Sequence, residues 1–313
     1  MTGERRTPAV PGPEPRSAGT LAGTYVVLLR TPDRAGPMAA ELRSRGTRVR
    51  LLPLIDFQRP ADTVPVSAGL RELGQGEFDW IILTSATTVQ ALEAAAQALG
   101  SHFAELCRGT KVAAVGSGTS RALEAAGITV DLLPSQDQSA RGLAAIWPAL
   151  RPGRNRIFLP QADIANPFLR TALSGAGWEV LAVPAYETVD YPAPAELQII
   201  PRESAPDEQL LTPSDYRTWA LSGSAGETGA HAVVVTSPST AHRFVRDALQ
   251  PGTAVLVAIG DPTAAALQDL GHPAAATARH PTPAGVADAV QTAMTARNLQ
   301  NLPHPDPEGR EQP

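Results

Sequence analysis

Two Thr-Ser pairs are the residues of this chain whose type and position first suggest chemistry. Thr84-Ser85 and Thr236-Ser237 each end a short apolar run and precede a segment with helical spacing. A serine at that position accepts hydrogen bonds from the free backbone N–H groups of the helix's first turn. At the carboxyl end of a parallel strand, the same hydroxyl and N–H groups also form a site for a carboxylate or phosphate. A helix cap alone and an anion site are both open interpretations for Ser85 and Ser237.

Two Gly-x-x-Thr turns occupy a similar position after a strand. Gly116 and Gly260 are expected to allow a tight exit from the strand and close approach of a ligand, while Thr119 and Thr263 place a hydroxyl near the helix start. The turns are not dinucleotide fingerprints, because Arg121 stands where Gly-x-Gly-x-x-Gly needs its third glycine and 260–265 also lacks the second. No Walker motif occurs. Together, the Thr-Ser and Gly-x-x-Thr segments suggest a ligand with several carboxylates.

Other patterns that carry catalysis or bind metals are missing from the sequence. The six histidines never fall four apart on one helix or beside a carboxylate pair, so no zinc site is expected, and Gly-x-Ser-x-Gly is absent. Cys107, the single cysteine, is predicted to be a small core residue rather than a nucleophile. A single cysteine also excludes a disulfide framework and indicates a reducing compartment, which we take to be the cytoplasm.

Charge and hydropathy exclude two further classes of protein. A net charge of −5 and a pI near 5.7 argue against nucleic-acid binding, which needs a basic face. No stretch of about 18 apolar residues occurs, so neither a membrane span nor a secretory signal is expected.

Seven short apolar runs must position these turns: 25–29, 80–84, 111–116, 156–160, 179–183, 232–237 and 254–260. Each is followed by a helix-length pattern, which predicts an α/β protein with parallel strands buried on both faces. Residues 1–23 and 300–313 are rich in Pro, Gly and charge and are predicted to be disordered tails. The stretch 190–230 is interpreted as a connector with one helix near 207–221.

The chain also repeats itself. Residues 115–127 (VGSGTSRALEAAG) align with 259–271 (IGDPTAAALQDLG), and WIILTSATTV (80–89) aligns with VVVTSPSTA (233–241). Residues 26–55 likewise match 156–186, with Pro53 and Pro184 at equivalent positions. The repeat predicts two copies of one α/β plan.

The order of the motifs resembles the uroporphyrinogen-III synthase family. They are LLRTP (28–32), LPLI (52–55), FDWIILTS (78–85), VGxxT (115–119), AYETV (185–189), VTSPS (235–239) and IGxxT (259–263). The resemblance spans about residues 24–290 and implies two Rossmann-like (flavodoxin-like) parallel-sheet domains joined by a two-strand connector. By this analogy, 24–53 and 190–290 form the first domain, 58–182 the second, and 54–57 with 183–189 the interdomain connectors.

The resemblance also implies an activity. The family cyclises hydroxymethylbilane to uroporphyrinogen III, inverting ring D through a spiro intermediate and releasing water, with no metal or organic cofactor. Tyr186 would assist loss of the terminal hydroxyl in a cleft between the domains; packing alone is its other interpretation. Substrate carboxylates would be bound by the following residues: Arg30, Ser85, Gly116, Thr119, Ser237, Gly260 and Thr263.

Partners follow from the same resemblance. We expect hydroxymethylbilane as the small-molecule substrate, transient contact with hydroxymethylbilane synthase, no nucleic acid, no membrane and a monomeric protein.

Pro262 removes one backbone donor before Thr263, which weakens that anchor. An anion-sensing regulatory protein of the same fold is the alternative function.

Overall fold

A computed structural model of the chain describes residues 21–151, 153, 155–199, 210–221, 230–249 and 254–300. These residues form two compact units. The described residues up to Leu54 and from Leu210 onward form the first unit, and those from Ile55 to Ile199 form the second. No helix within the described ranges is long and apolar enough to cross a membrane.

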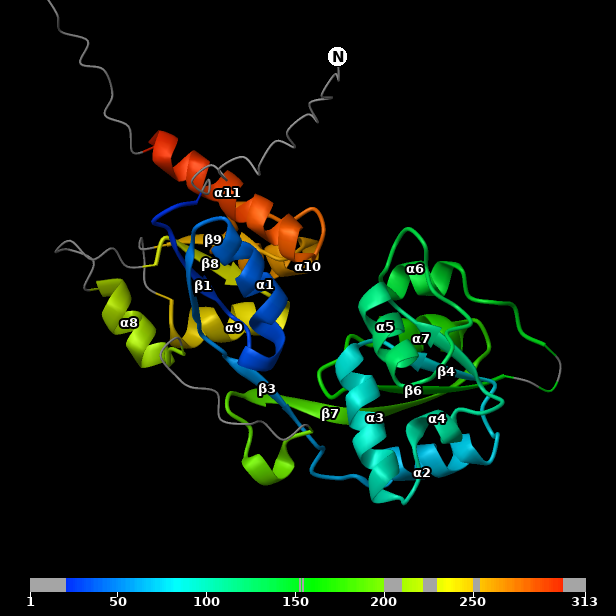
Figure 1. Cartoon of the computed structure of the whole chain (residues 1–313). Coiled ribbons are helices and arrows are strands. Elements are labelled where there is room, and N and C mark those ends of the chain that lie inside the picture. The colour runs from blue at the N-terminus through cyan, green and yellow to red at the C-terminus, as the bar shows by residue number, and fades with distance from the viewer. Residues whose placement is uncertain are drawn as a thin grey trace, which may run out of the picture. The chain divides into compact units, whose positions relative to one another are not determined.

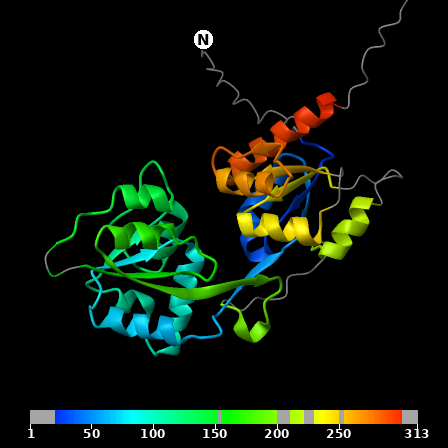
Figure 2. The same ribbon diagram turned by 180° about the vertical axis from the view of Figure 1, so that it is seen from behind.

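The first unit is a five-stranded parallel sheet with helices on both faces (Figures 1 and 2). The strand order is β10-β9-β8-β1-β2. Helices α1 and α11 share one core with one face of the sheet, and α8, α9 and α10 share another core with the opposite face. Its elements are β1 (Tyr25–Leu28), α1 (Pro32–Ser44), β2 (Arg48–Leu51), α8 (Pro213–Leu221), β8 (Ala232–Val235), α9 (Pro238–Asp247), β9 (Val255–Ala258), α10 (Asp261–Asp269), β10 (Ala276–Thr277) and α11 (Pro283–Gln300).

The second unit has the strand order β3-β7-β6-β4-β5, parallel except for β3. Helices α2, α3, α4 and α5 pack on one face and α6 and α7 on the other. Its elements are β3 (Ile55–Gln58), α2 (Val64–Gly74), β4 (Trp80–Leu83), α3 (Ala86–Ala98), α4 (Phe103–Leu106), β5 (Lys111–Ala114), α5 (Ser117–Ala125), α6 (Ala140–Ala145), β6 (Arg156–Ala162), α7 (Phe168–Gly175), β7 (Glu179–Asp190) and the 3-10 turn η1 (Ala195–Leu197).

Both units follow the flavodoxin-like strand order, as the internal repeat predicts. When its strands are numbered in chain order, the first sheet reads 2-1-3-4-5. The parallel strands of the second sheet, numbered in chain order from β4, read 2-1-3-4. The order reverses between β1 and β8 in the first unit and between β6 and β4 in the second. Ligands of such open sheets bind where the order reverses, beyond the carboxyl ends of the strands. The α/β class with parallel sheets is therefore confirmed.

The structure differs from the sequence-based outline where the chain passes between the units. Residues 190–199 were predicted to belong to the first domain but pack on the second unit. There the Ala193 N–H donates to the carboxylate of Asp56, which is fully buried, and the Arg59 N–H donates to the carbonyl of Leu197. The predicted connecting segments are themselves sheet strands, since β3 pairs antiparallel with the end of β7. A buried carboxylate that accepts backbone N–H groups fixes the segment here.

The predicted tails and the predicted helix near 207–221 also need correction. Residues 1–20 and 301–313 lie outside the described residues, but Leu21 is 3% exposed and packs in the first unit's core, and α11 runs through Gln300. Helix α8 starts at Pro213, and 207–209 lie outside the described residues. Its start has a local cause, because Thr212 and Asp215 cap each other's backbone N–H groups at 3.1 and 2.9 Å.

Candidate active site

Each unit contains one of the two Thr-Ser pairs at the carboxyl end of a central strand. Ser85 caps α3 and Ser237 caps α9, each accepting from the backbone N–H of a threonine three residues on, at 3.1 Å. The hydroxyls of Thr88 and Thr240 lie 3.0 and 2.7 Å from the respective serine oxygens. Both serines therefore act as helix caps. An anion site at these two serines stays a prediction.

Tyr186 is brought to Ser85 by the sheet of the second unit. It stands in β7 opposite Ala162, the last residue of β6, and its phenol oxygen lies 3.3 Å from the Ser85 hydroxyl oxygen. The ring packs edge-on against Phe57 of β3, with centroids 5.3 Å apart. Only 6% of Tyr186 is exposed. The tyrosine is therefore fixed by its ring, while its hydroxyl reaches the end of the sheet where the strand order reverses.

The Ser85 hydroxyl has a full set of partners. A serine oxygen accepts two hydrogen bonds and donates one, and here it accepts from the Thr88 N–H and also contacts the hydroxyls of Thr88 and Tyr186. When Thr88 donates to Ser85, Ser85 donates to the Tyr186 oxygen and leaves the phenol proton for another acceptor. When Tyr186 donates to Ser85 instead, Ser85 donates to the Thr88 hydroxyl. The three hydroxyls therefore form a hydrogen-bonded chain whose protons can point either way.

The Gly-x-x-Thr turns begin helices α5 and α10 in the two units. Thr119 and Thr263 are buried in the first turns, where their N–H groups bond to the carbonyls of Gly116 and Gly260 at 3.0 Å. Neither threonine hydroxyl has a hydrogen-bond partner among the described residues. The prediction that Gly116 and Gly260 are needed for a tight turn is wrong. Both have an ordinary extended backbone, so neither turn needs glycine for its conformation. A methyl group would fit at Gly116 and would meet nothing within 4 Å at Gly260.

The first turns of α5 and α10 offer different backbone donors. At α5, the Ser117 N–H already donates to the side-chain carbonyl of Gln138 at 3.0 Å. Sequence reasoning missed Gln138, which lies in an irregular segment without a motif. At α10, Pro262 has no N–H and Asp261 adds a carboxylate to the first turn. The two turns are therefore related by the repeat but are not equivalent as anion sites.

Arg30 follows β1 and is the predicted cation of the first unit. It is half-buried, and within the described part of the chain its side chain makes no hydrogen bond or ion pair. Burial, with a smaller effect of nearby Arg34, lowers its pKa from the ordinary value. A guanidinium in this setting is stabilised by an added carboxylate.

The eight predicted site residues divide equally between the units. Ser85, Gly116, Thr119 and Tyr186 lie in the second, and Arg30, Ser237, Gly260 and Thr263 lie in the first. Seven of them follow strands that are neighbours within their unit, because β4 pairs with β5 and β8 pairs with both β1 and β9. Tyr186 instead lies within β7, which β6 separates from β4. Of the eight, the structure joins only Ser85 and Tyr186 by a direct side-chain hydrogen bond among the described residues.

The remaining candidate groups take no part in this arrangement. Cys107 is 6% exposed at the end of α4, and burial raises the pKa of its thiol to about 12, as fits a core residue. No group of three or more His, Cys, Asp or Glu side chains that could hold a metal occurs in the described ranges.

Comparison with known proteins decides the family. The family model described as "Uroporphyrinogen-III synthase HemD" matches residues 36–288. The chain belongs to the uroporphyrinogen-III synthase family. The match begins after Arg30 and includes the other seven predicted site residues.

Relatives in this family are moderately similar in sequence. The uroporphyrinogen-III synthase of Synechococcus elongatus is 28% identical over 169 residues, which are 54% of this chain. The match spans 62% of that relative's length, less than two thirds. The chloroplastic uroporphyrinogen-III synthase of Oryza sativa subsp. japonica is 28% identical over 222 residues, 69% of this chain and 70% of the relative.

Two solved structures share the fold at low identity. A mutant uroporphyrinogen III synthase from the extremely thermophilic bacterium Thermus thermophilus matches with a TM-score of 0.58 and 19% identity, covering 88% of this chain and 100% of that one. The uroporphyrinogen-III synthetase of Helicobacter pylori 26695 matches with a TM-score of 0.53 and 16% identity, covering 88% and 99%. These matches agree with the two-domain α/β architecture of the family.

Proposed function

We propose that this chain is an active uroporphyrinogen-III synthase, a cyclising lyase that converts hydroxymethylbilane to uroporphyrinogen III with inversion of ring D and loss of water. The observation that carries the proposal is the phenol of Tyr186, 3.3 Å from the Ser85 hydroxyl at the start of α3. A buried ring with its hydroxyl at the carboxyl edge of an open α/β sheet supports a role in proton transfer to a bound ligand.

The first step is loss of the terminal hydroxyl of the bilane. Tyr186 donates its proton to that oxygen, the C–O bond breaks, and water leaves while the pyrrole nitrogen supplies the electron pair. The resulting methylene carbon is attacked by the substituted carbon of ring D to give the spiro intermediate. The original bond between that carbon and its bridge to ring C then breaks, and the free α-carbon of ring D attacks the released bridge carbon to close the inverted macrocycle. The proton lost from this α-carbon balances the one that Tyr186 supplied.

The hydroxyl chain gives Tyr186 a means to carry charge during this step. As the phenol loses its proton, Ser85 donates to the phenolate oxygen and Thr88 donates to Ser85 in turn. The proton shifts need no movement of heavy atoms, so the donors are already aligned when the charge develops. Ser85 is therefore a positioning residue for Tyr186 as well as a helix cap.

The carboxylates of the substrate are bound by the turns at the sheet edges. Arg30 provides a half-buried guanidinium, and Thr119 and Thr263 provide hydroxyls with no partner among the described residues. Ser237 presents the start of α9, and the open space beside Gly260 lets a carboxylate approach the start of α10. Gly116 begins the matching turn of the second unit, where Gln138 lies against it. These contacts favour the geometry in which the substituted carbon of ring D is attacked.

Product analysis tests this function. Hydroxymethylbilane cyclises unaided to uroporphyrinogen I, so the protein is incubated with freshly generated bilane and the oxidised uroporphyrin isomers are separated. Excess isomer III that grows with protein concentration is expected. Isomer I alone would refute the enzyme, and anion binding with isomer I alone would favour a regulatory protein.

We also propose that the protein works as a cytoplasmic monomer that receives its unstable substrate during transient contact with hydroxymethylbilane synthase. The buried thiol of Cys107 suits a reducing compartment. Sedimentation of the protein alone and with that synthase tests the monomer and the contact separately.

A further inference from the structure

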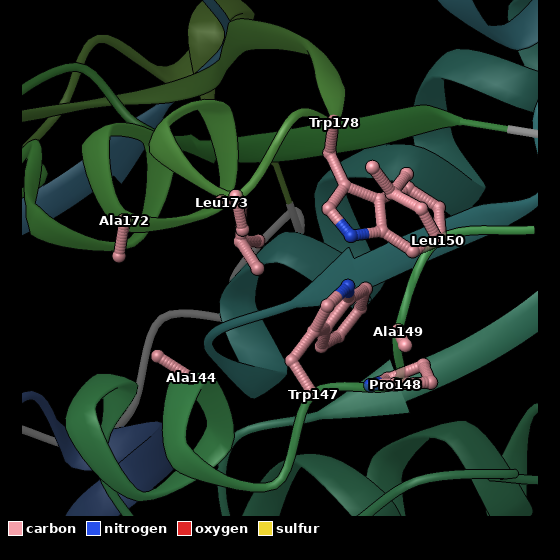
Figure 3. Close-up of a pocket in the computed structure, with 9 residues that line it drawn as sticks. Ala144, Trp147, Pro148, Ala149, Leu150, Ala172, Leu173 and Trp178 are labelled. Atoms are coloured by element: carbon pink, nitrogen blue, oxygen red, sulfur yellow. The ribbon is translucent and has the colours of Figure 1, made fainter.

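A pocket lined by tryptophan lies in the second unit, away from the proposed active site (Figure 3). It has a volume of about 190 Å³ and opens between α6, α7 and the segment 147–150. A neighbouring cavity of about 180 Å³ shares Pro148, Ala149 and Trp178 with it. Trp80 and Lys111, which line the neighbouring cavity, are the first residues of β4 and β5, whereas Ser85 and Gly116 follow those strands. The pocket therefore lies at the opposite end of the sheet from the candidate active site.

Three of the chain's four tryptophans gather here. The ring of Trp147 lies 5.1 Å from that of Trp80 and 6.0 Å from that of Trp178, centroid to centroid, crossing the latter at 81°. These rings give the pocket flat apolar walls of the kind that stack on a planar ligand.

One wall carries a hydrogen-bond donor, the indole N–H of Trp147. The indole N–H of Trp147 is buried and makes no hydrogen bond among the described residues. In Figure 3 its nitrogen lies on the side of the ring nearer Trp178. An N–H that meets only an aromatic ring makes a weak hydrogen bond, so a ligand oxygen would satisfy the donor better than the protein does.

The neighbouring cavity adds positive charge. It is lined by Lys111, the only lysine in the sequence, and by Arg151. The Lys111 ammonium lies 5.3 Å from the centre of the Trp80 ring, and neither cation has an ion pair among the described residues. Asp79, the one acidic residue of this lining, accepts from the backbone N–H of Arg156 at 3.0 Å. Two cations and one engaged carboxylate leave a net positive charge beside the tryptophans.

We propose that this pocket is a second binding site, for a small planar aromatic carboxylate. The aromatic part lies against Trp147 and Trp178, and the carboxylate lies toward Lys111 and Arg151. The oxygen nearer Trp147 accepts its indole N–H. The site is separate from the tetrapyrrole chemistry and does not depend on it.

The single lysine makes a direct test possible. Reductive methylation with isotope-labelled formaldehyde keeps the charge of Lys111 and gives one lysine signal in the NMR spectrum of the full chain. Titration with naphthoate is expected to shift that signal and to quench tryptophan fluorescence along one saturation curve, with Kd below about 1 mM. Acetate, which has no ring, and naphthalene, which has no carboxylate, are expected to bind more weakly. No saturable change with naphthoate, or equal binding of acetate, would overturn the proposal.

Variants separate the charge from the indole donor. Lys111→Met is expected to weaken naphthoate binding about tenfold, measured by fluorescence, and to leave naphthalene binding unchanged. Trp147→Phe keeps an aromatic wall but removes the N–H and is expected to weaken naphthoate binding several-fold. Arg71→Met, which removes an exposed cation on α2, is the matched control. Because Lys111 is exposed, its variant should fold as the unchanged chain does, and unaltered naphthoate affinity in it would refute the site.

Discussion

Tyr186→Phe tests the proposed chemistry most directly, because it removes one oxygen and leaves the packing in place. The edge-on contact with Phe57 at 5.3 Å is retained. The lost hydrogen bond to Ser85 is 3.3 Å long, against about 2.7–2.8 Å for a typical O–H···O bond. Ser85 keeps two other partners. The expected loss of unfolding free energy is therefore at most about 1 kcal/mol.

The expected effect on turnover is larger than the effect on stability. A positioned proton donor contributes about 100-fold or more to the rate, which is about 2.7 kcal/mol in the barrier. The assay measures the initial rate of isomer III from freshly generated hydroxymethylbilane, with isomer I as the internal measure of unaided cyclisation. Unfolding in urea is followed in parallel.

Three further variants control this measurement. Tyr216→Phe changes another buried tyrosine, which packs edge-on against Phe244 in the first unit, and should leave turnover unchanged. Ser85→Ala and Ser237→Ala each remove a helix cap worth about 1 kcal/mol. Ser85→Ala also removes the partner of Tyr186 and should lower kcat, whereas Ser237→Ala removes a proposed carboxylate contact and should mainly raise KM. A Tyr186→Phe protein that makes isomer III within twofold of the unchanged rate would remove the phenol from the mechanism.

Three further predictions concern other residues. Arg30→Met should raise KM for the bilane about tenfold without loss of stability, since burial already lowers the pKa of this guanidinium, which has no ion pair among the described residues; an unchanged KM would place Arg30 outside the site. Gln138→Glu puts a negative charge beside the Ser117 N–H and should raise KM, whereas a lowered KM would contradict a carboxylate subsite at α5. His231 accepts a hydrogen bond from the Tyr25 N–H at 3.0 Å, and burial lowers the pKa of its imidazole. The stability that neutral His231 adds is therefore present above its pKa in the unfolded chain, and it is lost as the pH falls through its pKa in the folded protein. His231→Gln should weaken the pH dependence of the unfolding free energy, measured in urea, between pH 7 and pH 5 (about the range of an ordinary His pKa). An unchanged pH dependence would contradict this role.

The class of the fold and its repeated plan could be predicted from the amino-acid pattern alone. Short apolar runs and helix-length patterns are local properties, and all seven predicted runs coincide with sheet strands. The Thr-Ser caps could be predicted for the same reason, because a serine and the N–H three residues later meet within a single turn. Thr212 and Asp215 carried an equally local signal for the start of α8, although the predicted helix began too early.

Tertiary structure decided which of these turns meet other groups. Ser85 and Tyr186 are 101 residues apart, and their contact depends on the order β7-β6-β4, which no local pattern encodes. The same holds for Gln138 at the start of α5 and for the lack of a described partner at Arg30. Local propensity fixes where a strand ends, whereas the order in which strands pair brings residues distant in sequence into hydrogen-bonding reach. The candidate hydroxyls could be predicted from the sequence, and only the assembled sheet joined Ser85 and Tyr186.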